Sequence, residues 1–327
     1  KVFHNVFSEI ISLENLFLAW QEFRRGKRKR IDVQGFEFNL EDNLFQLHSE
    51  LKDKTYQHGI YQPFYVTDPK LRHIHKASVR DRVLHQAIFR VLYPVFDKNF
   101  ISDSYSCRVN KGTHGAVTRL EQFSQKLSQN HNHSIFALKC DVRKFFDSVN
   151  QTTLLELIKR KINDDDTVWL IKEIIASFEK ESGKGLPLGN VTSQLFANIY
   201  LNELDWFVKH KLKEKYYIRY CDDFVILGDR AGHLSELSDR INAFLLHKLS
   251  LSLHSDKIII RKYSRGIDFL GYVVLPHYRV LRTKTKKRLL KRINEKNRSS
   301  YLGVLKHCRG FKVEEKLKFL LRHSFLA

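Results

Sequence analysis

The chain has 327 residues, 43% of them hydrophobic and 12% aromatic, which is enough to bury a sizeable core divided among two or three subdomains. Its 57 Lys and Arg against 36 Asp and Glu give a net charge of +21, which favours a polyanionic partner such as nucleic acid. No run of about 18 apolar residues or signal-peptide pattern occurs, and the four cysteines form no Cys-x-x-Cys pair. We therefore expect no membrane partner, no zinc or disulfide framework, and a cytoplasmic location.

The first part of the chain predicts two helices around a basic turn. Apolar residues recur at helical spacing over 13–20 and again over 40–51. Between them, residues 24–30 read Arg-Arg-Gly-Lys-Arg-Lys-Arg, a nuclear-import-like signal, a solvated face or, as we interpret it, a phosphate contact. Residues 60–76 then alternate as extended structure does.

The next segment predicts helices over 78–93 and 115–128, the first of them ended by Pro94. At the centre of the chain the helical spacing of apolar residues stops. Residues 135–141 instead form a short apolar run that ends at Asp141, as a buried strand would. The remaining predicted elements are helices at 151–161, 165–179 and 193–213, a strand–acidic turn–strand over 216–227, a helix at 234–249, short strands near 257–262 and 267–274, and basic helices from 284.

The acidic turn contains Asp222 and Asp223, whose side chains would point to opposite faces of the hairpin. Another carboxylate must therefore come from elsewhere, and Asp141 ends a separate buried strand. If the strands are neighbours, Asp141 and Asp222 converge, which suits two Mg²⁺ ions roughly 3.5–4 Å apart with hard oxygen ligands. An Asp-Asp turn alone fits a solvated hairpin tip equally well. The order of the elements is what predicts a two-metal site.

Seven ordered motifs then resemble those of reverse transcriptases. Residues 141–147 (Asp-Val-Arg-Lys-Phe-Phe-Asp) resemble the first catalytic motif, and residues 220–223 (Tyr-Cys-Asp-Asp) the Tyr-x-Asp-Asp box. The other matching segments are 78–87, 104–108, 186–194, 253–257 and 266–272. The resemblance covers roughly residues 10–290 and implies an α/β (α+β) right-hand polymerase, with fingers, an antiparallel-sheet palm and a helical thumb, that synthesises DNA on RNA.

The middle motif narrows the resemblance. Most reverse transcriptases carry Gln-Gly-x-x-x-Ser-Pro, whereas residues 188–194 read Leu-Gly-Asn-Val-Thr-Ser-Gln. This departure, together with 195–205 and 111–114, resembles the enzymes of diversity-generating retroelements, which are related to group II intron-type reverse transcriptases. In that family the enzyme copies a template-repeat RNA with errors at template adenines, for mutagenic retrohoming. It works with a small basic accessory protein that forms a pentamer.

The resemblance also assigns roles to catalytic residues. Asp141, Asp222 and the peptide carbonyl of Val142 would bind the two Mg²⁺ ions, for which Mn²⁺ can substitute, and Asp223 would be the second catalytic member of the turn pair. Lys257 would protonate the leaving pyrophosphate, although a surface or phosphate contact explains it equally well.

Basic residues of the fingers are candidates for the incoming nucleotide. Lys70 and Arg72 would reach the triphosphate, because phosphate binding needs mobile or forked cations. The runners-up are Arg80, Arg82 and Arg108, which are more often structural or template-contacting. In so basic a chain, any one of these side chains could also belong to a solvated face.

Further residues would shape the nucleotide and template sites. Phe146 would exclude a ribose 2′-hydroxyl, unless it is a core residue like its neighbour Phe145. Gly189 would let the backbone approach the nucleotide, and Gln194 would touch the template or simply begin a helix. Since Leu188 and Gln194 depart from the common motif, we expect them to alter fidelity.

The predicted parts are an N-terminal and fingers region at 1–140, a palm at 135–276 with a fingers insertion at about 150–215, and a basic thumb at 277–327. Within the palm, Phe269–Tyr272 would support the primer end or only pack in the core. The expected partners are template RNA, the primer/cDNA duplex, dNTPs and the accessory protein, in a prokaryotic or phage setting.

Two rival functions stay open. One is a reverse transcriptase of another prokaryotic retroelement or of phage defence; an intron-mobility enzyme is disfavoured because about 50 residues follow the palm, too few for a maturase and endonuclease. The other is an RNA-binding scaffold without catalysis, against which the presence of all three carboxylates argues.

Overall fold

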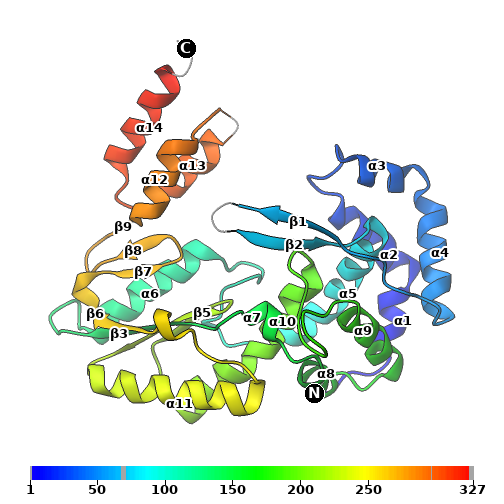
Figure 1. Ribbon diagram of the computed structural model, residues 1–327, viewed down its shortest axis with the longest axis horizontal. Helices are drawn as coiled ribbons and strands as arrows, with labels where there is room; N and C mark the ends of the chain where they lie inside the picture. The colour runs from blue at the N-terminus through cyan, green and yellow to red at the C-terminus, as the bar shows by residue number, and fades with distance from the viewer. Residues whose placement is uncertain (1, 68–70, 296, 324–327) are drawn as a thin grey trace. The chain divides into compact units, whose positions relative to one another are not determined.

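A computed structural model of the chain describes residues 2–67, 71–295 and 297–323 (Figure 1). The backbone divides into two compact units built from interleaved segments. Unit 1 comprises residues 1–101, 142–207 and 242–252, and unit 2 comprises 102–141, 208–241 and 253–327. The expected mixed α/β class is confirmed, while the division into fingers, palm and thumb stays a prediction. No helix in the described parts of the chain is both long and apolar enough to span a membrane.

Unit 1 begins with the helices α1 (Val6–Ile11), α2 (Leu13–Phe23), α3 (Ile31–Phe38) and α4 (Leu40–Lys52). The helices α2 and α4 confirm the two that apolar spacing predicts, because the recurring side chains form one buried stripe on each. The hydroxyl of Ser12 accepts a hydrogen bond from the backbone N–H of Asn15 (3.2 Å) and so caps the start of α2.

A two-stranded antiparallel hairpin follows, β1 (Gln62–Val66) paired with β2 (Arg72–Lys76), and then the long helix α5 (Val79–Asp97). The expectation that Pro94 ends this helix is wrong, because α5 continues one turn beyond it. Proline removes a single backbone donor and disturbs the carbonyl four residues earlier. On either side of Pro94, the buried side chains of Leu92 and Phe96 keep the helix in the core.

The rest of unit 1 is helical. It contains α7 (Phe145–Ser148), α8 (Gln151–Lys159), α9 (Asp165–Ala176), α10 (Val191–Trp206) and the end of α11 (Ala231–Leu249). A π-helical turn, Phe207–Lys211, continues α10, so the helix predicted over 193–213 is present with a change of pitch.

A buried chain of polar groups joins α5 to α10 inside unit 1. His58 Nδ1 lies 2.7 Å from the carbonyl oxygen of Gly59, and the two Nε2 atoms of His58 and His85 lie 3.1 Å apart. His85 Nδ1 lies 3.1 Å from Thr192 Oγ1. These contacts fit one assignment, in which His58 donates to Gly59, His85 donates to His58 and Thr192 donates to His85. In this assignment His85 is neutral, because its Nδ1 atom accepts the hydrogen bond from the Thr192 hydroxyl.

This network predicts a loss of stability in acid. Complete burial lowers the pKa of His85 from 6.5 to about 3. Between those values the unfolded chain binds a proton that the folded chain does not, so the stabilisation is complete above pH 6.5 and falls as the pH drops towards 3. We expect the free energy of unfolding to fall by about 2 kcal/mol more between pH 7 and 5 in the wild type than in His85→Gln. Urea unfolding at each pH measures the free energy. An equal dependence on pH in both proteins would contradict the prediction. The control His133→Gln changes an exposed histidine and should keep the pH dependence of the wild type.

Unit 2 contains a four-stranded antiparallel sheet in the order β4-β5-β3-β6. Its strands are β3 (Phe136–Asp141), β4 (Tyr217–Tyr220), β5 (Asp223–Gly228) and β6 (Ile259–Lys262). The predicted buried strand and hairpin are thus confirmed, with β3 central between β5 and β6.

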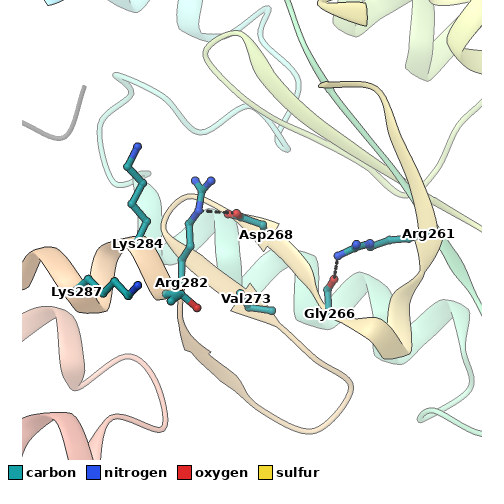
Figure 2. A pocket seen from close by; sticks show the side chains of 8 residues that line it. Arg261, Gly266, Asp268, Val273, Arg282, Lys284 and Lys287 are labelled. Carbon is teal, nitrogen blue, oxygen red and sulfur yellow. Dashed lines mark hydrogen bonds and ion pairs between the residues drawn. The ribbon is translucent and has the colours of Figure 1, made fainter. Parts of the chain in front are cut away.

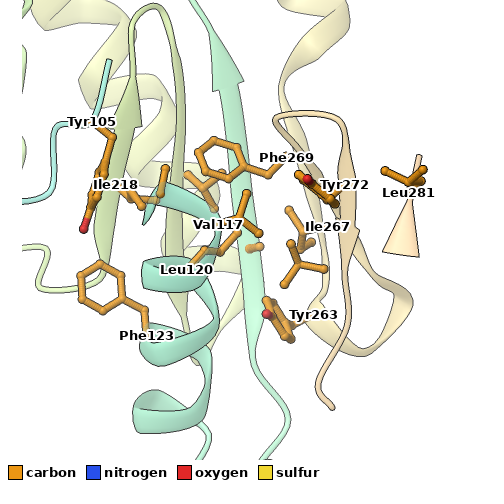
Figure 3. Close-up of a cluster of buried hydrophobic side chains, with 14 of the residues drawn as sticks. Tyr105, Val117, Leu120, Phe123, Ile218, Tyr263, Ile267, Phe269, Tyr272 and Leu281 are labelled. Atoms are coloured by element: carbon orange, nitrogen blue, oxygen red, sulfur yellow. The ribbon is translucent and has the colours of Figure 1, made fainter. Parts of the chain in front are cut away.

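A second sheet of unit 2, in the order β7-β8-β9, consists of Ile267–Phe269, Tyr272–Val274 and Arg279–Leu281. The helices of this unit are α6 (Thr113–Leu127), the start of α11, α12 (Thr283–Arg292), α13 (Arg298–Leu305) and α14 (Phe311–His323). Figure 3 shows Val117 and Leu120 of α6 directed towards the β7–β8 strands, where Ile267 and Phe269 are buried in the same cluster. Each fully buried side chain of this kind contributes about 1.5–3 kcal/mol, which anchors the β7–β8 hairpin.

Candidate active site

The register of β3 against β5 brings the acidic residues of unit 2 together. Asp141, the last residue of β3, is the direct cross-strand partner of Asp223, the first residue of β5. Tyr220 pairs with Asp223, so Cys221 and Asp222 form a two-residue hairpin turn beside them. Burial raises the pKa of Asp222, and the negative charge of Asp141 raises it further. The neighbouring strands that the sequence required are therefore present.

A buried arginine holds the acidic turn in place. Cys221 has a φ of 56°, in the left-handed region that costs a residue with a side chain roughly 1 kcal/mol. Arg219, which is fully buried, donates hydrogen bonds to the carbonyl of Cys221 (3.1 Å) and to Ser104 Oγ (3.1 Å). Ser104 itself forms a parallel bridge with Arg219. The segment 104–108, one of the seven motifs that resemble those of reverse transcriptases, thus lies against β4 in unit 2.

Two lysines accompany the carboxylates. Lys257 Nζ lies 2.6 Å from Asp141 Oδ1, which brings this predicted proton donor to the site. Lys139 Nζ lies 3.4 Å from Asp223 Oδ2 and donates a hydrogen bond to the carbonyl of Asp268 (2.7 Å). Sequence reasoning missed both Lys139 and Arg219. Two features of the sequence could have indicated them. Each is a cation within an otherwise apolar strand, and Lys139 also lies two residues before Asp141, on the same face of the strand.

The electrostatics of the carboxylates fit a bound divalent cation. Burial raises the pKa of Asp223 to about 7, although Lys139 acts in the opposite direction. Its Oδ1 atom is buried without a hydrogen-bond partner among the described residues, and the charge of Asp141 raises the pKa of both turn carboxylates. Crowded carboxylate oxygens with an unused acceptor are donors that Mg²⁺ prefers, and a cation would relieve their repulsion.

The ligand set itself stays a prediction, with Asp141, Asp222 and the carbonyl of Val142 as the residues that would hold the metal. Among the residues that the structure describes, no three His, Cys, Asp or Glu side chains already stand in metal-binding geometry.

Leu188 and Gly189, two of the residues predicted to bind the nucleotide, lie in unit 1, where the 186–190 loop meets β2. The backbone N–H of His75 donates to the carbonyl of Leu188 (3.0 Å), and the side-chain amide of Asn190 donates to the carbonyl of His75 (3.3 Å). Gly189 has a φ of 114°, and a Cβ there would lie 2.8 Å from Ile74 Cγ2. Glycine is thus required at this position by backbone conformation and by the close approach of β2.

The other predicted nucleotide and template residues are placed as follows. Arg72, at the start of β2, and Gln194, in the first turn of α10, are exposed. Phe145 is buried and contacts the half-buried Phe146, whose carbonyl accepts a hydrogen bond from the backbone N–H of Leu186 (2.7 Å). Lys70 lies outside the described residues.

The three runner-up arginines have partners in the protein. Arg80 and Arg82 form ion pairs with Glu50 (2.8 Å) and Asp32 (2.7 Å), respectively. Arg108 donates to the carbonyl of Ser104 (3.0 Å). These contacts favour structural roles for all three.

Gly189 generates a testable prediction. The Gly189→Ala change should lower the free energy of unfolding by about 1–3 kcal/mol, because the new Cβ forces a strained φ and displaces Ile74. Denaturant unfolding measures the loss. Gly35→Ala in α3 is the matched control, since no described residue outside its own stretch of helix comes within 4 Å of its Cβ position, and it should leave stability unchanged or raise it. A Gly189→Ala protein as stable as the wild type would show that the loop tolerates a side chain at this position.

Comparison with known proteins gives consistent results. Residues 67–274 match the family described as "Reverse transcriptase (RNA-dependent DNA polymerase)". Protein YkfC of Escherichia coli K12 is 25% identical over 260 residues, which cover 65% of this chain and 68% of YkfC. Group II intron-encoded protein LtrA of Lactococcus lactis is 22% identical over 363 residues, covering 88% of this chain and 59% of LtrA. The chain thus spans about two thirds to three fifths of these relatives.

Solved structures with a similar fold include telomerases. Apo telomerase of Candida tropicalis, truncated from the C-terminal domain, has a TM-score of 0.51 at 14% identity, covering 72% of this chain and 59% of the telomerase chain. Telomerase of Candida albicans, in complex with a fragment of telomeric RNA, has a TM-score of 0.53 at 12% identity, covering 81% and 55%. At such low identity the likeness supports the right-hand polymerase fold alone.

Proposed function

The chain belongs to the reverse transcriptase family, the RNA-dependent DNA polymerases, and from this premise we propose that it copies RNA into DNA at Asp141, Asp222 and Asp223. The observation that carries the proposal is the cross-strand pairing of Asp141 with Asp223 directly beside the Cys221–Asp222 turn. This pairing concentrates three hard-oxygen side chains at one edge of a rigid sheet. Nucleotidyl transfer needs little covalent work from the protein, and depends on such positioning and charge.

The residues around the carboxylates can be given chemical roles. When bound, Mg²⁺ would lower the pKa of the primer 3′-hydroxyl and neutralise the charge that develops on the triphosphate. Asp141, Asp222 and the Val142 carbonyl would hold it. Lys257, 42% exposed and 2.6 Å from Asp141, can exchange that contact for one to the leaving pyrophosphate and donate its proton there.

A basic groove at the start of α12 supports a polynucleotide substrate. It encloses about 590 Å³ and is lined by Arg261, Gly266, Asp268, Val273, Arg282, Thr283, Lys284 and Lys287 (Figure 2). Two of the cations already have partners in the protein. Arg261 donates a hydrogen bond to the Gly266 carbonyl (3.3 Å), and Arg282 forms an ion pair with the Asp268 carboxylate (2.7 Å). Lys284 and Lys287 are exposed and form no ion pair with a described residue. We propose that these two lysines contact backbone phosphates.

This groove predicts a change in salt dependence. Replacing Lys284 and Lys287 by Gln should weaken primer–template binding and reduce the slope of log K against log salt by about 1–2, since each phosphate contact contributes roughly 0.9. Fluorescence anisotropy over a range of salt concentrations measures the slope. A Lys159→Gln and Lys172→Gln double variant, which removes two exposed lysines of α8 and α9, keeps the net charge matched and should retain the wild-type slope. Equal slopes in the two double variants would remove the groove from the binding surface.

At a finer level, we propose that the enzyme serves a diversity-generating retroelement and errs at template adenines. The support is the departure at Leu188 and Gln194 and its position in the fold. The carbonyl of Leu188 accepts a hydrogen bond from the backbone N–H of His75, and Gln194 is exposed in the first turn of α10. These residues flank Gly189, where the nucleotide would approach. A template-repeat RNA and a small basic pentameric accessory protein would complete the system.

Primer extension on a defined RNA template with Mg²⁺, followed by sequencing of the cDNA, tests both levels. We expect extension by the wild type and by Asp229→Ala, which alters an exposed carboxylate, and a loss of about 10³-fold or more in Asp222→Ala. Errors should concentrate at template adenines, and a Leu188→Gln, Gln194→Pro variant should reduce that bias.

The possible outcomes separate the alternatives. Evenly spread errors would retain the polymerase and favour a retroelement of another kind or a phage-defence enzyme. Absence of extension by the wild type, even with cognate RNA and accessory protein supplied, would favour a non-catalytic RNA-binding scaffold.

A further inference from the structure

We propose that Lys139 is a positioning residue for catalysis, which sets the orientation of the Asp223 carboxylate by tying it to the backbone of β7. The inference rests on the proposed polymerase function and adds a residue to it. It stands on two contacts of one ammonium group, 3.4 Å to Asp223 Oδ2 and 2.7 Å to the Asp268 carbonyl oxygen.

The place of Lys139 in the sheet directs its side chain towards the site. Lys139 lies in the central strand β3, opposite Val225 of β5 and Ile259 of β6. Side chains alternate along a strand, so Lys139 projects from the same face as Asp141. A lysine at the edge of the sheet could turn outwards to water. In the central strand, its side chain and that of Asp223 are only 19% and 22% exposed.

The carbonyl of Asp268 on β7 fixes the position of the Lys139 ammonium group. Asp268 is paired with Val273 in the β7–β8 hairpin, so its carbonyl oxygen moves only with that hairpin. A free lysine side chain samples many rotamers, and a carboxylate with one mobile partner would rotate. Anchoring the ammonium to a backbone carbonyl removes that freedom. Oδ2 of Asp223 is then held, and Oδ1, which has no hydrogen-bond partner in the described part of the chain, is presented in one direction.

The contrast with Lys257 supports a positioning role over proton donation. Lys257 lies in a short 3₁₀ turn, Ser255–Lys257, and is 42% exposed. Lys139 is less exposed and has both a carboxylate and a carbonyl as partners. An exposed lysine with one partner can move to substrate, whereas Lys139 would have to break two contacts to do so. The two lysines therefore have different roles. Lys257, at Asp141, donates a proton, and Lys139, at Asp223, positions the carboxylate.

Asp268 also connects Lys139 to the basic groove. Its carbonyl accepts the hydrogen bond from Lys139, while its carboxylate forms the ion pair with Arg282 that Figure 2 shows. The orientation of Asp223 consequently depends on the β7–β8 hairpin, the element predicted to support the primer end. Displacing the hairpin would displace the anchor of a catalytic carboxylate.

Three variants test the proposal. Lys139→Met keeps the length of the side chain and removes the charge, Lys139→Arg keeps the charge, and Lys262→Met removes an exposed lysine of β6 as the matched control. In single-nucleotide incorporation we expect kcat to fall about 10- to 100-fold in Lys139→Met, because a small misplacement of a reacting group costs up to about 100-fold. KM for dNTP and Kd for primer–template should stay within about two-fold. Lys139→Arg should restore most of kcat, and Lys262→Met should match the wild type.

A thermal double-mutant cycle supplies a readout that does not need activity. Lys139→Met should lower Tm by about 2–4 °C in the wild-type background and by much less in Asp223→Asn, where no charge is left unpaired. Equal Tm shifts in both backgrounds, an unchanged kcat, or a loss of kcat matched by an equal loss of primer–template affinity would each overturn the proposal. If the wild type itself fails to extend a primer, the proposed function fails, while the cycle still decides whether Lys139 and Asp223 are coupled.

Discussion

The candidate site depends on the register between two strands, β3 and β5. This register places the carboxylate of Asp141 opposite that of Asp223. Burial raises the pKa of Asp223 to about 7, and the negative charges of Asp141 and Asp222 raise it too, so the arrangement carries an electrostatic cost. The surrounding structure offsets this cost with neighbouring cations. Lys257 lies at Asp141, Lys139 lies at Asp223, and the guanidinium of Arg219 supports the turn from beneath. A strand register shifted by one residue would move Asp141 to the other face of the sheet.

The same principle, a costly local arrangement supported by its neighbours, recurs in unit 1. There a glycine with φ of 114° allows the 188–190 loop to accept a hydrogen bond from β2, so that a strand predicted to carry nucleotide-binding cations is joined to the loop of the middle motif. Behind that loop, the contacts of His58 with His85 and of His85 with Thr192 connect the starts of α5 and α10. The second arrangement buries polar groups and satisfies them through directed hydrogen bonds, as burial requires.

The large positive charge has a distribution that the total of +21 does not convey. Several basic side chains are used internally, since Arg80, Arg82 and Arg219 have protein partners. Others, such as Lys284 and Lys287, remain exposed in a groove and retain their full electrostatic potential for phosphates. Net charge therefore indicates the class of partner, whereas only the pairing of each cation indicates which residues can meet that partner.

From the sequence alone, the order of elements, the mixed α/β class, the buried strand ending in Asp141 and the hairpin carrying Asp222 and Asp223 could be predicted. Those features are local, because they depend on apolar period and turn residues within a few positions. Pro94 shows the limit of local rules, since buried side chains on both sides carry α5 past it. Tertiary structure alone decided the partners of the polar groups. Lys139 meets the carbonyl of Asp268, 129 residues away in the chain, and Arg219 meets Ser104, 115 residues away. No local pattern distinguishes a strand lysine that will find such an acceptor from one that will face water. The pairing is fixed by which strands become neighbours and by the register between them, and these are set by the packing of the whole unit.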